Sequence, residues 1–177
     1  MPLNLIKTYS DLLEIMHLDI NIRKQSLKRI FSRDIEENIG FSYRGKIIRP
    51  VKKDDGVSSM DTLFNHLITE DEEYIDEHNK KQTRRVFERD RSERLHWLKH
   101  CLSTDNMVVF SVEERDRVKR KDVIRTYVLD EQQKYVIVLE PQKSGLDYYL
   151  LTGYFLNRDY ASKQMKKKYK KRLPDIL

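Results

Sequence analysis

Four strand-like segments that follow one another between residues 106 and 157 constrain the fold more than any other feature of the chain. They are rich in Val, Ile, Leu, Tyr and Phe, and polar connections such as DEQQK at 130–134 separate them. Helical patterns occupy much of the chain before them. An order in which helices come first and consecutive strands follow predicts an α+β fold. We expect N-terminal helices followed by a mainly antiparallel sheet of about four strands. A basic C-terminal helix that ends near Pro174 is expected to close the chain.

The N-terminal third has helical periodicity. Ser10 is expected to cap a helix over 11–18, and a second helix is expected over 22–39. The apolar stripe of that second helix is predicted to contain Leu27, Ile30 or Phe31, Ile35 and Ile39. Residues 41–50 predict a short strand pair broken at Gly45, and residues 60–68 predict a short helix.

An acidic stretch divides the chain. Six of the eleven residues from Glu70 to Lys80 are acidic, which favours a linker. We therefore expect a helical accessory segment with a short strand pair over 1–70, an acidic linker over 71–83 and an α+β domain over 84–177. The single cysteine, Cys101, rules out an internal disulfide and suits a reducing compartment. No apolar run is long enough for a membrane span, so a soluble, cytoplasmic protein is expected.

Most of the positive charge lies in one segment. Residues 158–172 hold eight Lys or Arg against one acid, a local charge of +7, whereas the whole chain carries +6. A basic segment that also contains Tyr160 and Tyr169 can follow a phosphate backbone. The alternative is a solvated tail with no ligand.

Residues 84–102 are predicted to form an amphipathic helix with charges on its apolar face. A projection at 100° per residue places Arg91 and Arg94 within the stripe made by Phe87, Leu95, Leu98, Cys101 and Leu102. Buried arginines need partners, and the candidates are Glu93, Glu140 and Asp147. The same projection places His96 and His100 on the opposite, solvated face. Because they lack a third ligand, a zinc site is not expected.

The strand at 147–157 is interrupted at its centre by Thr152, Gly153 and Tyr154. Strict alternation would place Tyr149, Leu151, Gly153 and Phe155 on the face toward the helices. Thr152 and Tyr154 would then share the other face. Gly153 permits the close approach of another backbone or a ligand. The alternative is a half-exposed sheet face on which Thr and Tyr are favoured by propensity alone.

The order of RSERLHWLKHCL, YVIVLEP and DYYLLTGYFLN, followed by a basic helix, resembles the barnase–EndoU–colicin–RelE superfamily of small RNases. The similarity covers roughly residues 84–172 and is greatest to the phage and mobile-element branch, several of whose relatives are toxins. It implies that the open face of a four-stranded antiparallel sheet holds RNA. It also implies cleavage without a metal or other cofactor, in which a ribose 2′-hydroxyl attacks the adjacent phosphate and leaves a 2′,3′-cyclic phosphate.

Carried onto this chain, the resemblance implies catalytic roles for Arg91, Arg94, Thr152 and Tyr154, with His96 as a candidate base. The residues expected to bind RNA are Lys99, Arg158, Lys163, Lys166, Lys167 and Lys170. The expected partners are RNA and an antitoxin or immunity-type protein, without a membrane. Two other functions stay open: a non-catalytic RNA- or DNA-binding module, and an interaction protein that an acidic partner neutralises.

Overall fold

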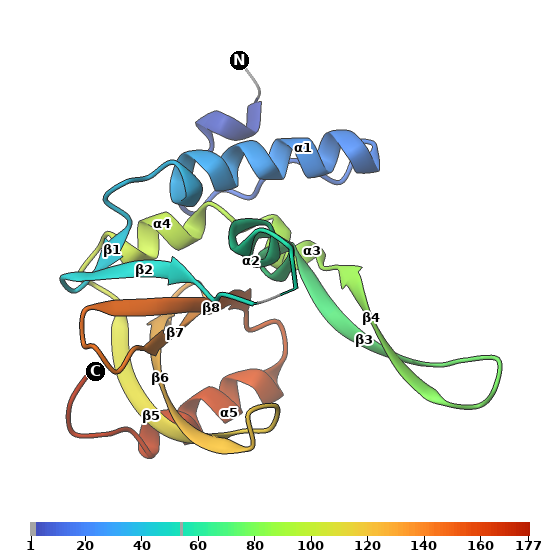
Figure 1. Cartoon of the computed structure of the whole chain (residues 1–177). Coiled ribbons are helices and arrows are strands. Elements are labelled where there is room, and N and C mark those ends of the chain that lie inside the picture. Colours follow the sequence, from blue (N-terminus) through green and yellow to red (C-terminus); the bar gives the residue numbers. More distant parts are fainter. Residues whose placement is uncertain (1–2, 54) are drawn as a thin grey trace.

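A six-stranded sheet forms the centre of the computed structural model, which describes residues 3–53 and 55–177 (Figure 1). Four of the strands form an antiparallel meander, as predicted: β5 (Val108–Asp116), β6 (Lys121–Asp130), β7 (Tyr135–Pro141) and β8 (Asp147–Phe155). The α+β class and the mainly antiparallel sheet are therefore confirmed.

The predicted strand pair of the N-terminal third extends this sheet. β1 (Ser42–Tyr43) and β2 (Lys46–Pro50) are joined by Arg44 and Gly45, whose φ angles of 49° and 75° suit a two-residue hairpin turn. Residues 47–50 of β2 then pair in parallel with the first half of β8. The strand order is β1-β2-β8-β7-β6-β5, and this added pair is why the sheet has six strands instead of about four.

Both faces of the sheet are covered by helices. Figure 1 shows α1 (Ile20–Phe31), α2 (Ser59–Ile68) and α4 (Trp97–Leu102) on one side and α5 (Asp159–Lys170) on the other. The core on the first side includes Phe31, Leu67, Leu98, Ile137 and Leu150. The second core includes Phe110, Tyr127, Val136, Leu156 and Met165. Among the described residues, no helix has the length and apolar character that crossing a membrane requires.

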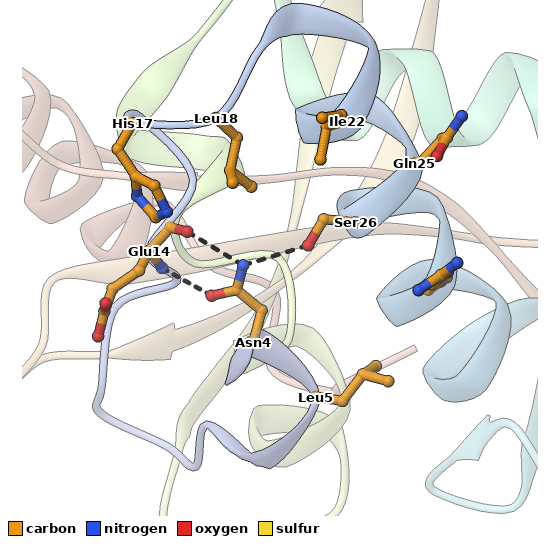
Figure 2. A pocket seen from close by; sticks show the side chains of 9 residues that line it. Asn4, Leu5, Glu14, His17, Leu18, Ile22, Gln25 and Ser26 are labelled. Atoms are coloured by element: carbon orange, nitrogen blue, oxygen red, sulfur yellow. Dashed lines mark hydrogen bonds between the residues drawn. The ribbon is translucent and has the colours of Figure 1, made fainter. Parts of the chain in front are cut away.

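The predicted helix over 11–18 is wrong. After a 3₁₀ helix at Leu3–Ile6, this segment runs without regular structure, and Leu13 and Ile15 are buried while Glu14 between them is exposed. Burial at every second residue is the period of extended chain. The Asn4 side chain holds the segment there: its Nδ2 donates to the Glu14 carbonyl (3.1 Å), and its Oδ1 accepts from the Glu14 N–H (2.7 Å), as Figure 2 shows.

The second predicted helix is confirmed in its central part. α1 begins after Asp19, whose side chain accepts from the Asn21 N–H, and a π-helix at Ser32–Glu36 continues it. Leu27, Ile30, Phe31 and Ile35 are buried as predicted. Ile39 is fully exposed, because the helical structure ends at Glu36.

A β-hairpin occupies the stretch where an acidic linker was expected. β3 (Thr69–Ile75) and β4 (Lys81–Phe87) pair over seven residues each, and Figure 1 shows the hairpin extending away from the body. The two central acids of β3 face bases of β4: Glu72 pairs with Arg84 (2.7 Å) and Asp71 with Arg85 (3.0 Å). The acidic composition is therefore one half of a charge-paired ribbon.

The predicted helix over 84–102 is shorter and broken. Its first residues belong to β4, so helical structure starts with α3 (Arg89–Ser92), capped by the Glu88 side chain. A stretch of turns separates α3 from α4. The helical projection assumed one straight helix, so the side-chain directions it gave for residues 93–96 are unreliable.

Gly153 leaves room for two side chains that pack between α4 and the sheet. A Cβ atom at this position would lie 2.7 Å from the Tyr135 Oη and 2.9 Å from the Leu98 Cδ2. Both distances are shorter than normal contacts, so a side chain here would displace the buried Leu98 and Tyr135 side chains. This packing explains why a glycine stands at the centre of the strand.

We predict that Gly153→Ala lowers the free energy of unfolding by about 1–3 kcal/mol, because the added methyl group overpacks this contact. Gly40→Ala is the matched control. A Cβ at Gly40 has its nearest neighbour at 3.9 Å, so its effect should stay within about 0.5 kcal/mol. Urea denaturation of both variants measures the difference. Equal stability of the two variants would show that the contact is not tight.

Candidate functional site

Arg91 belongs to α3, and its side chain binds backbone at the end of α2. Its Nη1 donates to the carbonyl oxygens of His66 (2.9 Å) and Thr69 (2.8 Å), at the C-terminal end of α2. A cation at this end satisfies carbonyls that have no partner within the helix. Burial lowers the pKa of Arg91 from its ordinary value. Arg91 therefore anchors one helix to the next in the structure as it stands.

Arg94 is buried as the projection indicated. Its Nη1 donates to the Asp90 carbonyl (2.8 Å) and lies 3.4 Å from the Asp90 carboxylate, and its guanidinium lies 3.9 Å from the centre of the Phe155 ring. Asp90 was not among the expected partners, Glu93, Glu140 and Asp147. Those three carboxylates pair instead with Arg89, Lys119 and Arg49, respectively.

His96 is buried, contrary to the prediction that it faces water. Its Nε2 lies 3.1 Å from the Thr8 carbonyl, and the broken helix turns the ring toward the N-terminal segment. Burial lowers its pKa from the ordinary value. His100 is exposed as predicted and stacks on the Tyr9 ring at 3.9 Å.

Thr152 and Tyr154 lie on the sheet face that α5 partly covers. They pair with Val138 and Val136 of β7, two residues of the second core. Within the described structure, the buried Thr152 Oγ1 has no hydrogen-bond partner. The two side chains therefore share one face of β8, as expected.

A bulge in β8 changes the rest of the expected alternation. The register passes from Val138–Thr152 to Leu139–Leu150, which leaves Leu151 without an opposite residue. Gly153 faces the helices as predicted. Tyr148 and Leu150, assigned to the other face, are in the helix-side core, because one extra residue reverses the alternation.

A charged cluster lies on the same face as Thr152 and Tyr154. We call it the Glu114 cluster, and its members are Glu114, Asp116, Arg125, Tyr127 and Lys168. The Glu114 carboxylate accepts from Lys168 Nζ (2.6 Å), from the Tyr127 hydroxyl (2.7 Å) and from Arg125 Nη1 (3.0 Å). Arg125 also donates to Asp116 (2.8 Å). The cluster combines two carboxylates, two cations and a phenol.

The electrostatics of this face depend on how Glu114 is surrounded. Burial opposes its ionisation, but hydrogen bonds from Lys168 and Tyr127 outweigh that and hold the pKa of Glu114 below its ordinary value. Burial raises the pKa of Tyr154 to about 12, and the charge of Glu114 adds to the effect. The pKa of Tyr127 is also raised, mainly by burial. Glu114 is thus ionised at neutral pH and both phenols are protonated.

The lysines expected to bind RNA divide between two surfaces. Arg158 caps α5, and Lys163, Lys166, Lys167 and Lys170 are exposed along it. None of these five has an ion pair with another described residue, whereas Lys168 is held by Glu114. Lys99 lies on α4, across the sheet from α5, and pairs with Asp34 at 3.6 Å. The α5 residues thus form one basic surface, to which Lys99 does not belong.

The Glu114 cluster was missed in the sequence, although a signal for it exists. Glu114 of β5 and Arg125 and Tyr127 of β6 share a face with apolar residues of the same two strands. Alternation places Glu114 on the face of Phe110 and Val112. Polar residues on the core face of two adjacent strands indicate a site. Seeing this one requires the register that pairs β5 with β6.

No family model, curated protein or solved structure gives a significant match to this chain. The resemblance to small RNases therefore rests on the motifs and on the order of elements. Among the described residues, no three His, Cys, Asp or Glu side chains gather as they would around a metal ion.

His96 predicts a pH dependence of stability. The unfolded imidazole binds a proton near pH 6.5, and the buried one only at lower pH. The unfolded state therefore binds more protons below pH 6.5, so the free energy of unfolding falls as the pH decreases. We expect His96→Gln to flatten this decrease between about pH 7 and pH 5.

Urea unfolding at several pH values measures the effect. His78→Gln, at an exposed histidine in the β3–β4 turn, is the control and should keep the wild-type slope. An unchanged slope in His96→Gln would contradict the burial of this imidazole.

Proposed function

We propose that this protein is a metal-independent endoribonuclease that holds RNA on the α5 side of its sheet. The observation that supports this most is that Thr152 and Tyr154, the strand residues of the RNase resemblance, share a face with the Glu114 cluster. The exposed lysines of α5 border the same face. A proton acceptor, cations and hydroxyl groups beside a basic helix suit the cleavage of a phosphodiester.

The chemistry assigns a role to each group. Glu114 takes the proton of the ribose 2′-hydroxyl, whose oxygen attacks the phosphorus. Arg125 and Lys168 stabilise the negative charge on the phosphorane oxygens. The bond from phosphorus to the 5′-oxygen breaks, and Tyr154 donates the proton that the leaving oxygen needs. The products are a 2′,3′-cyclic phosphate and a 5′-hydroxyl.

Binding of substrate changes the basicity of Glu114 in the useful direction. In the free protein, Lys168 and Tyr127 stabilise its charged form. A phosphate that draws Lys168 and Arg125 away removes part of this stabilisation, so the pKa of Glu114 rises. A more basic carboxylate is then available where the 2′-hydroxyl is bound.

A non-catalytic RNA-binding module is the second candidate. Every residue that Glu114 binds belongs to α5 or β6, so these contacts also hold the two elements in place. This structural role favours the second candidate, because it explains the cluster without catalysis. Incubation with excess RNA in EDTA distinguishes the two functions. Only an enzyme produces many cyclic-phosphate ends for each protein molecule. In either case, an acidic antitoxin-type protein is a suitable inhibitor, because its charge would complement α5.

We predict that Glu114→Gln lowers the cleavage rate by about 100-fold or more, because the amide keeps the acceptor oxygen but cannot take a proton. Glu113→Gln is the matched control: the preceding residue of β5 is exposed, points to the other face and should keep wild-type activity. Gel analysis of a defined RNA in EDTA measures both variants. Equal rates of cleavage would remove Glu114 from the mechanism.

Thr152→Val separates function from stability. The Thr152 Oγ1 has no partner among the described residues, so replacing it by a methyl group should leave the free energy of unfolding unchanged or raise it. If the hydroxyl binds a phosphate oxygen, cleavage should fall by about 10-fold or more. Thermal unfolding and the same RNA assay give the two readouts. A variant that is stable and fully active would exclude this role.

A further inference from the structure

The flanks of α5 carry different chemistry. Met165 packs into the second core, and Lys168 reaches the Glu114 cluster. Lys166 and Lys170 lie on another flank, beside a cleft. At 100° per residue, Lys163 and Lys167 point outward between these two flanks. The cluster and the cleft are therefore separated by the width of one helix, with lysines on the path between them.

The cleft has a volume of about 570 Å³, which is within the range of sites that hold small ligands. Its apolar lining comes from β5, β6, the segment after β8 and α5, through Val108, Leu129, Leu156 and Met165, respectively. Around this lining stand lysines at positions 134, 166 and 170, together with the ring of Tyr169. Apolar walls and a cationic rim suit a ligand with a flat apolar part and a negative charge.

We infer that this cleft binds a nucleotide of the RNA that flanks the one cleaved at the Glu114 cluster, an inference that rests on the proposed function. The base packs against the apolar lining, and its phosphate meets Lys166 and Lys170. Glu131 and Asp159, which also line the cleft, can accept hydrogen bonds from the ring N–H or amino groups of a base.

The charge pattern of α5 supports an RNA strand as the ligand. Lys163 and Lys167, like Lys166 and Lys170, are four residues apart, so like charges lie next to each other on the helix. Such pairs destabilise an isolated helix, and no described carboxylate neutralises these four. A phosphate backbone that crosses α5 from the cluster to the cleft would meet all of them in turn.

Ser162→Phe tests the cleft itself, because Ser162 lines it and a phenyl ring would fill part of its volume without changing charge. The probe is a fluorescein-labelled, 2′-O-methyl oligouridine of twelve nucleotides, which binds without being cleaved, followed by fluorescence anisotropy. We expect affinity to fall by about tenfold while the slope of log affinity against log salt stays unchanged. Ser103→Phe, an exposed position after α4, is the control and should bind as the wild type does.

Lys166→Gln/Lys170→Gln provides a second test that does not depend on whether Ser162→Phe folds. Loss of two phosphate contacts should reduce the salt slope by about 1.4. A folded Ser162→Phe that binds within twofold of wild type, or an unchanged slope in the lysine variant, overturns the inference and leaves the proposed function standing. A wild-type protein that binds no RNA overturns both.

Discussion

The packing of the Leu98 and Tyr135 side chains over Gly153 joins α4 to the sheet. The ends of these two side chains fill the space where a side chain at position 153 would be. Trp97 of α4 meets the Tyr135 ring edge to face at 5.5 Å, and its Nε1 donates to the Asp11 carbonyl (2.9 Å). The same packing therefore fixes both the helix and the extended N-terminal segment above it.

On the other face of the sheet, the charges that anchor α5 are the ones that the proposed RNA site would use. Lys168 and Arg125 tie α5 and β6 to Glu114, and the same two cations are the natural partners of a phosphate. A ligand that binds them weakens the attachment of α5. The buried contacts of Met165 and Leu156 hold the helix independently of charge, so the cluster can exchange partners without losing the fold.

Sequence patterns predicted the segments whose structure depends on neighbouring residues in the chain. Alternation and turn residues gave the four strands of the meander, the Arg44-Gly45 hairpin and α5, all of which are present. The predictions failed where distant residues decide. Asn4 holds 11–18 in an extended form, and β4 takes the start of the predicted helix over 84–102.

The candidate site was predicted only in part, for the same reason. Thr152 and Tyr154 were placed correctly because alternation holds on their side of the bulge. His96 is buried because the helical structure is broken between Ser92 and Trp97, and no local sequence pattern predicted this break. Glu114, Arg125 and Lys168 come from three elements, and their meeting depends on the strand register and on where α5 docks.

The β3–β4 hairpin leaves the body and returns to it at nearly the same point. Thr69 faces Phe87, and the Glu88 N–H donates to the Ile68 carbonyl at 3.0 Å, so α2 and α3 are already joined at the base of the ribbon. Residues 70–75 and 81–85 are exposed and contribute nothing to either core. The entropic cost of closing a loop grows only slowly with the length of the loop. The hairpin can therefore become longer or shorter, or be exchanged, in the course of evolution while the sheet and the candidate site keep their geometry.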